Sequence, residues 1–169
     1  MQGVELDHDK YSAYLNQHLF AADAGVQAFK AAADTWKDTK WEPSFLQLHE
    51  ELKDSHAKVK ALISDLGYET STLRNVASGL AAVAGRLNPI NLLRNEDGIA
   101  TQAEFDALAG AVRAQQMMWD TLVVLSEIDE RLDAEFCRSM VERCEDQRRR
   151  IIEINEETVH ARFTRAPGE

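Results

Sequence analysis

Glutamate and histidine are the residues of this sequence that could bind a metal ion or carry out acid–base chemistry. A di-iron centre in a four-helix bundle needs a glutamate from each of two helices and a Glu-x-x-His pair from each of the other two. The sequence contains two such pairs, Glu5/His8 and Glu157/His160. The first precedes the first predicted helix, and the second lies near the end of the last one. We therefore do not expect a di-iron centre.

His18 is the histidine that falls on an apolar helix face. At helical spacing it shares that face with Tyr11, Leu15 and Phe29. Ser55, Gln115 and Gln147 point inward from other predicted helices. His56 flanks the stripe that contains Ser55, and Trp119 belongs to the same stripe as Gln115. The predicted ligand-binding or buried polar layer consists of His18, Ser55, His56, Gln115, Trp119 and Gln147.

Two interpretations of this polar layer stay open. Buried polar groups must find partners, so the layer can be an internal hydrogen-bond network that fixes helix register. It can also be a small-ligand or single-metal site that uses His18 with His56 or a nearby carboxylate. We predict no catalytic residue and no cofactor on the first interpretation. The sequence contains no serine–histidine–acid arrangement, P-loop or dinucleotide fingerprint.

The elements that must position these residues are helices. Only three prolines and eight glycines interrupt the chain, and apolar residues recur at helical spacing along most of it. We predict helices over about 9–36, 43–66, 72–87, 102–128 and 133–163. Asp7 or Asp9 is expected to cap the first, and Thr101 with Glu104 has the spacing of a capping box for the fourth. Leu62 and Ala161 are among the residues expected to point inward.

The lengths of the connections predict the fold. Short loops join the first two long helices and the last two, whereas more than thirty residues with a helix of their own separate these pairs. One long crossover between two hairpins is the ferritin-like arrangement. We therefore predict one all-α domain over 1–169, a four-helix bundle of ferritin-like topology. Gly25 is expected to allow two helices to approach closely.

The charge of the chain limits its partners. A formal net charge of −10 disfavours binding to a phosphate backbone, and Arg148–Arg150 is expected to pair with nearby acids on a solvated helix face. We predict no membrane span and no signal peptide. Cys137 and Cys144 lie too far apart on one helix to form a disulfide, which favours a reducing cytoplasm.

The stretch that contains Tyr14, Leu15, Asn16, His18 and Gly25 resembles the opening of uncharacterised bacterial helical-bundle proteins that are grouped with ferritin-like proteins. The likeness continues through the SDLGY stretch at the end of the second long helix, the crossover and the residues around Trp119. This resemblance implies the fold and carries no activity. The ligand set departs from that of ferritins and di-iron oxidases at every helix, so ferroxidase chemistry is not expected.

The function expected from the sequence is association. We predict a cytoplasmic, non-catalytic bundle that acts through a homodimer or a protein partner. The first interface candidate is the apolar face of the predicted crossover helix, which includes Leu80 and Val83. Met117 and Met118 are expected to serve packing or an interface. A single metal ion at His18 is the alternative.

Overall fold

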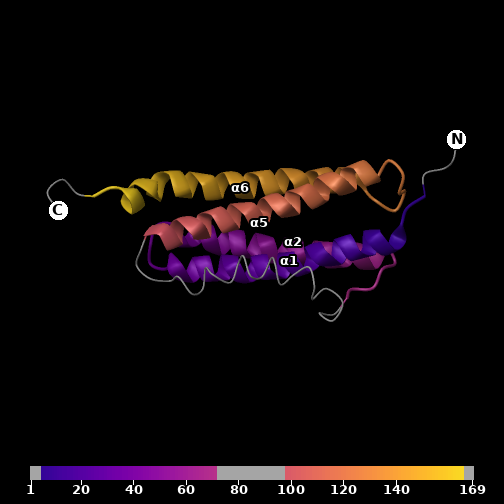
Figure 1. The fold of residues 1–169 in the computed structure, drawn as a ribbon, viewed down its shortest axis with the longest axis horizontal. Helices are drawn as coiled ribbons and strands as arrows, with labels where there is room; N and C mark the ends of the chain where they lie inside the picture. Colours follow the sequence, from indigo (N-terminus) through magenta and orange to yellow (C-terminus); the bar gives the residue numbers. More distant parts are fainter. Residues whose placement is uncertain (1–4, 72–97, 166–169) are drawn as a thin grey trace.

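The computed structural model describes residues 5–71 and 98–165 of the chain. Within these ranges the protein is helical and contains no strand, which confirms the all-α bundle expected from the sequence. The described helices are α1 (His8–Thr35), α2 (Glu42–Asp65), α5 (Gly98–Leu125) and α6 (Ala134–Phe163). Figure 1 shows them side by side in an elongated bundle.

The helices form two antiparallel hairpins. Residues 36–41 join α1 to α2, and residues 126–133 join α5 to α6. At one end of the bundle, the Nδ1 atom of His8 lies 2.6 Å from the hydroxyl of Tyr68. At the other end, Arg162 of α6 donates hydrogen bonds to Gln102 of α5. The Tyr14 hydroxyl, which donates to Thr121 Oγ1 at 3.4 Å, connects the hairpins.

Local chemistry fixes three of the helix ends. The Asp7 carboxylate accepts from the Lys10 N–H at 3.1 Å at the start of α1. Asp133 accepts from two backbone N–H groups at the start of α6. At the end of α2, Gly67 adopts φ +79°, and the N–H of Tyr68 donates to the carbonyl of Ile63 at 3.0 Å. This Schellman motif needs a left-handed residue, which glycine adopts without a steric penalty.

Three sequence-based expectations about the helices are wrong. α5 begins at Gly98, so Thr101 lies inside the helix and does not cap it. In α2, Ile63 is fully buried while Leu62 is only partly buried. Ala161 is exposed, and its half-buried neighbour Arg162 is the residue of the last turn of α6 that contacts α5, through Gln102 and Phe105. The predicted helix over 72–87, with Leu80 and Val83, lies outside the described residues.

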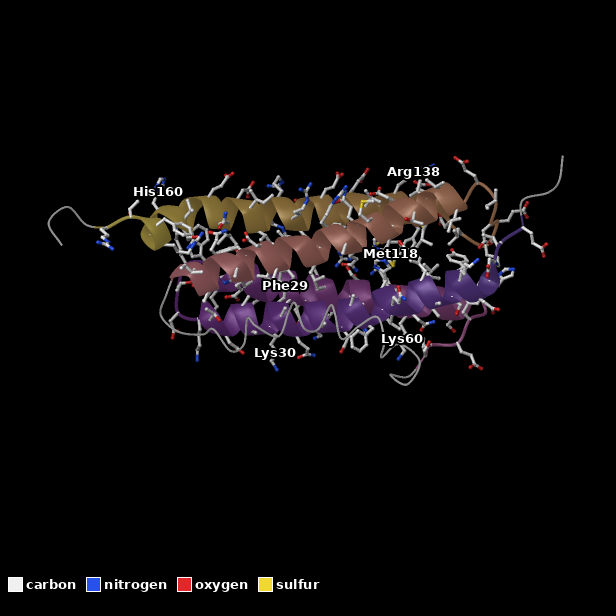
Figure 2. All side chains as sticks on the ribbon, viewed as in Figure 1. Phe29, Lys30, Lys60, Met118, Arg138 and His160 are labelled. Carbon is white, nitrogen blue, oxygen red and sulfur yellow. The ribbon has the colours of Figure 1, made fainter. Side chains whose placement is uncertain are left out.

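The core is a continuous apolar cluster between the two hairpins. Figure 2 shows Phe29 and Met118 among the helices, whereas Lys30 and Arg138 project from outer surfaces. Gly25 is buried, yet no described atom lies within 4 Å of the position that a Cβ would take there. The expected close approach of two helices at Gly25 is therefore not observed. None of the described helices has the length and apolar character needed to cross a bilayer.

Candidate functional site

The structure divides the predicted polar layer into buried and partly exposed members. Ser55 from α2, Gln115 and Trp119 from α5, and Gln147 from α6 are buried. His18 and His56 are only partly buried. The Nε2 atom of Gln147 donates to Glu51 at 3.1 Å. The Ser55 hydroxyl, the Gln115 Nε2 and the Trp119 Nε1 have no hydrogen-bond partner in the part of the chain that the structure describes.

His18 has an aromatic neighbour instead of a polar one. Its ring packs edge-on against Tyr14 with the ring centroids 4.7 Å apart. Burial lowers the pKa of His18, so its imidazole is neutral at pH 7. No hydrogen bond joins His18 to another described residue. Among residues 5–71 and 98–165, no group of three histidine, cysteine, aspartate or glutamate side chains is arranged to hold a metal ion.

A row of polar side chains joins α2 to α6. We call this row the α2–α6 seam; its members are Glu51, Asp54, Arg143, Gln147 and Arg150. Arg143 donates to Asp54 at 2.5 Å and to the backbone carbonyl of Glu51 at 3.0 Å. Arg150 donates to the Glu51 carboxylate and also pairs with Asp146 on its own helix. The seam therefore holds the two hairpins together through charge.

The arginine run contributes to this seam, which the sequence did not predict. Arg149 pairs with Asp146 and Glu153 on its own helix, as expected for a solvated face. Arg150 instead reaches across to Glu51 on another helix. Burial alone would raise the pKa of Glu51, but the hydrogen bonds from Arg150 and Gln147 outweigh it and hold that pKa below its usual value. Glu51 is thus a charged structural partner.

A second polar cluster closes the end of the bundle where α1 begins. Arg131 donates to both carboxylate oxygens of Asp129, at 2.7 and 2.8 Å, and to the Leu66 carbonyl at 2.8 Å. It also donates to the Tyr68 hydroxyl, which in turn contacts His8. These bonds occupy the guanidinium and satisfy a carbonyl at the end of α2. The cluster therefore locks three segments together and offers no free charge to a ligand.

Asn16 anchors the chain that leaves α2. Its side-chain amide donates to the carbonyls of Ser12 and Glu69, at 3.0 and 3.1 Å, and accepts from the Ser71 N–H at 2.8 Å. The residue is buried, so these bonds form away from competing water. Sequence reasoning missed this role, because the two partners beyond α1, Glu69 and Ser71, are backbone groups more than fifty residues away and leave no side-chain pattern.

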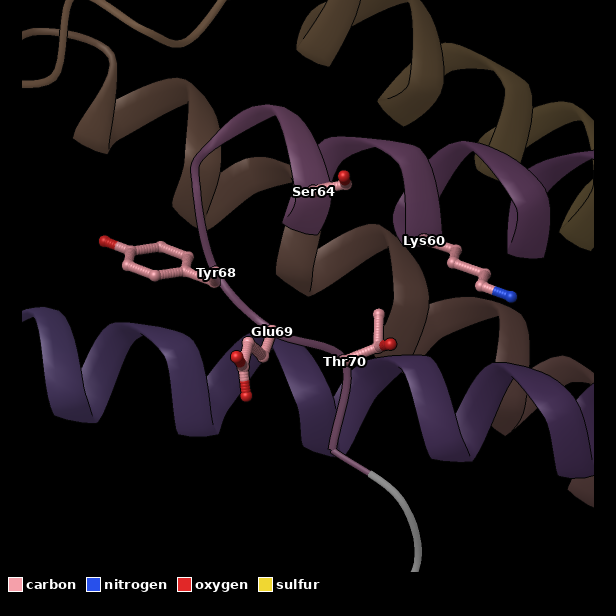
Figure 3. A pocket seen from close by; sticks show the side chains of 5 residues that line it. All are labelled: Lys60, Ser64, Tyr68, Glu69 and Thr70. Atoms are coloured by element: carbon pink, nitrogen blue, oxygen red, sulfur yellow. The ribbon is translucent and has the colours of Figure 1, made fainter.

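The surface hollow beside this segment does not have the residues of a catalytic or binding site. It is lined by Lys60, Ser64, Tyr68, Glu69 and Thr70. Figure 3 shows that the Tyr68 hydroxyl points away from Lys60 and Thr70. The lining brings together no nucleophile and base, and Lys60 and Glu69 have opposite charges. We assign no function to this hollow.

The two cysteines are buried and unpaired. Burial raises the pKa of the Cys144 thiol to about 12 and also raises that of Cys137. A thiol must be deprotonated to act as a nucleophile or metal ligand. Both side chains therefore remain protonated at neutral pH and serve as packing groups.

The feature that the sequence reading missed is a second apolar face on α5. Its positions alternate by four and three residues; most are exposed, whereas Ala107 is half-buried and the half-buried Thr121 accepts a hydrogen bond from Tyr14 of α1. This outward stripe consists of Ala103, Ala107, Gly110, Ala114, Met117, Thr121, Val124 and, in the turn after the helix, Ile128. Met117 is 46% exposed, Val124 64% and Ile128 47%. No position of the stripe carries a charged side chain.

Gly110 stands out within this stripe. A glycine inside a helix costs about 1 kcal/mol relative to alanine. Apart from its chain neighbours and the nearby backbone of α5, no described atom lies within 4 Å of the position that a Cβ would take at Gly110, so packing within the described chain does not require glycine there. Gly110 is thus a position where the described fold gives no reason for the residue present.

Comparison of the chain with protein-family models, with curated proteins and with solved structures finds no match.

Proposed function

We propose that this protein is a non-catalytic helical bundle that works by association with itself or with a protein partner. The observation that carries the proposal is the outward stripe of α5. A helix at the surface of a soluble domain normally has one apolar face and one polar face. An exposed run of apolar residues on an otherwise ordinary surface is a feature of interaction sites.

The outward face of α6 provides the contrast. Exposed positions there carry alternating charges, among them Glu135, Arg138, Glu142 and Arg149. The two helices belong to the same hairpin and are of similar length. The apolar outward face therefore distinguishes α5 from α6. This difference supports the proposal that another helix binds to this face of α5.

The proposal includes ferritin-like connectivity of the bundle. Lys40, just before α2, pairs with Glu157 of α6, and Gln102 of α5 bonds Arg162 of α6. The beginnings of α2 and α5 therefore lie at the same end of the bundle. A chain that leaves α2 at the other end must travel the length of the bundle to reach α5, which supports one long crossover. The resemblance to bacterial ferritin-like bundles is part of the same proposal.

The proposed compartment is the cytoplasm. Cys137 and Cys144 are both buried and unpaired, and free thiols are typical of reducing compartments. The proposal therefore includes a cytoplasmic protein partner or a second copy of the same chain.

The alternative function is binding of a single metal or small ligand at His18. Its support is the neutral imidazole, which has a lone pair available for coordination. The described residues add no second and third ligand. We therefore place this alternative second and test it through the melting temperature, as described below.

The test of association is site-specific photo-crosslinking in cells. A benzophenone amino acid replaces Met117 in one variant and Ile152 in a control, because Ile152 is an exposed apolar residue on α6. We expect adducts with protein, identified by mass spectrometry, from position 117 and none above background from position 152. Equal yields from the two positions would rule out the proposed surface.

A further inference from the structure

The outward stripe of α5 changes in size along its length. Its first half contains only small residues, namely Ala103, Ala107, Gly110 and Ala114, and its second half larger ones, namely Met117, Thr121, Val124 and Ile128. A stripe with this gradient is complementary to a copy of itself that runs in the opposite direction. A parallel copy would place large residues against large ones and leave gaps between small ones.

We propose that the stripe binds the same stripe of a second copy of this chain, antiparallel, across a two-fold axis between Ala114 and Met117. This inference rests on the proposed function and names its partner. Interfaces of this kind are isologous, so each contact occurs twice. The spacing of four and three residues is that of helices that pack by inserting side chains between those of the facing helix.

The register follows from the sizes of the residues. With the axis at this position, Met117 lies opposite the partner's Ala114, and Val124 lies opposite the partner's Ala107. Thr121 lies opposite the partner's Gly110, whose missing side chain leaves room for the approach of a second backbone. The dimer thus supplies the reason for Gly110 that the described fold lacks.

Charge supports the same register. Arg113 and Asp120 flank the stripe on one side, one position before Ala114 and Thr121. In the proposed register Arg113 lies opposite the partner's Asp120, and the pair occurs twice. Neither side chain forms an ion pair or a hydrogen bond within the described ranges. Asp106 lies opposite the partner's Glu127 only at the rim, beyond the end of α5, where solvent screens the repulsion.

Neighbouring registers are less favourable. A shift by one heptad in one direction places Asp120 against the partner's Asp120, although Arg113 then lies opposite the partner's Glu127, beyond the end of α5. The same shift also places Met117 against the partner's Thr121, so large residues face each other. The same shift in the other direction places Arg113 against the partner's Arg113. Like charges in these positions are destabilising. The sizes therefore favour one antiparallel alignment, and within the length of α5 the charges agree with it.

The test is sedimentation of the full-length chain and of charge-swapped variants at micromolar concentration. We expect the wild type to sediment as a dimer. Arg113→Glu and Asp120→Arg each convert two attractive pairs into repulsive ones, and each should weaken dimerisation about tenfold or more. The double variant R113E/D120R restores opposite charges and should recover the dimer.

A mixture of the two single variants gives the sharpest result. The R113E chain and the D120R chain complement each other at both positions, so the mixture should form a heterodimer although each variant alone dissociates. Arg138→Glu and Asp34→Arg make the same charge changes at exposed positions of α6 and α1 and serve as controls. Both controls should leave the dimer unchanged.

Two outcomes would overturn the inference. A monomeric wild type would show that no second copy covers the stripe, and residues 72–97 or another protein would take that place. Failure of the double variant and of the mixture to recover a dimer would show that the register is wrong. If photo-crosslinking at Met117 still captures a different protein while the purified chain is monomeric, the proposed function stands and this inference alone fails.

Discussion

The α2–α6 seam and the outward stripe of α5 reverse the usual distribution of polarity. The seam is charged although it lies between two helices, and the stripe is apolar although it faces outward. The charges of the seam are matched by Arg143–Asp54 and Arg150–Glu51 pairs across the gap. Apart from Thr121, which accepts from Tyr14, the stripe has no such compensation within the described chain, and the proposed function rests on this difference.

Charged residues between helices and apolar residues on a surface both depart from the usual distribution of polarity, but they have different causes. A polar group that lies between helices and is paired with an opposite charge is accounted for by its contribution to the stability of the fold. A contiguous run of apolar groups that stays exposed to water points to another molecule or another segment, whereas single exposed apolar groups do not. The same reasoning separates the end cluster around Arg131, in which the guanidinium is fully occupied, from α5.

The largest expected effect compares the two faces of α5. Trp119→Ala removes a fully buried side chain and should lower the free energy of unfolding by about 3 to 5 kcal/mol. Met117→Ala, two residues away on the outward stripe, should change it by no more than about 0.5 kcal/mol. Urea unfolding at low protein concentration measures both, because dilution minimises the contribution of association. Similar losses at the two positions would mean that the stripe is part of the folded core.

The next effect tests the seam. Glu51→Gln removes the charge that Arg150 and Gln147 contact, and it should lower the free energy of unfolding by about 1 to 2 kcal/mol. Glu50→Gln is the matched control, because Glu50 is exposed and pairs only with neighbours on its own helix, Lys53 and His49. Chemical denaturation of the two variants gives the comparison, and equal stability would show that the seam contributes nothing measurable.

The pH dependence of the seam has a defined sign. The pKa of Glu51 is lowered in the folded state, so its stabilising contribution is present above the ordinary glutamate pKa of about 4.3 and is lost as pH falls toward the folded value. Below about pH 4 the wild type should therefore lose more stability than Glu51→Gln. A melting series between pH 7 and 3 tests this difference, since other lowered carboxylates affect both proteins alike.

His18 offers a smaller effect in a different pH range. Its pKa is lowered by burial, so the unfolded chain takes up a proton below about pH 6.5 that the folded chain takes up only at lower pH. Stability should therefore fall with acidification below about pH 6.5, and His18→Gln should remove this dependence. Added Zn²⁺ or Fe²⁺ should leave the wild-type melting temperature unchanged. A rise that disappears in His18→Gln would instead support the metal-binding alternative.

The smallest effect separates seam and stripe by their response to salt. Screening by sodium chloride should weaken the partly exposed ion pairs of the seam by roughly 0.5 kcal/mol. Sulfate strengthens apolar association and should stabilise the contact made by the stripe. If the comparison is correct, unfolding in sodium chloride shows a loss of stability, and sedimentation in sulfate shows stronger association. The same trend in both measurements would contradict it.

Part of the fold could be predicted because its causes are local. The helical ranges follow from apolar spacing, and the Schellman end at Gly67 follows from a glycine after the last apolar position. The break between α5 and α6 was expected at 129–133, and Asp133 caps α6 there. Partners distant in sequence could not be predicted. The bonds of Asn16 to Glu69 and Ser71, and that of Arg150 to Glu51, depend on how the helices are placed.

The sequence by itself determined that α5 is a helix with apolar residues on two opposite faces, because helical periodicity is a property of the residue order. The sequence also predicts the inward face, which includes Gln115 and Trp119, and both residues are buried. Only the tertiary structure decided that the second face stays exposed, because α5 packs against α6 and α1 through its other side and leaves Ala114, Met117 and Val124 in solvent. The face of small residues was left outside, where a second copy can complete its contacts.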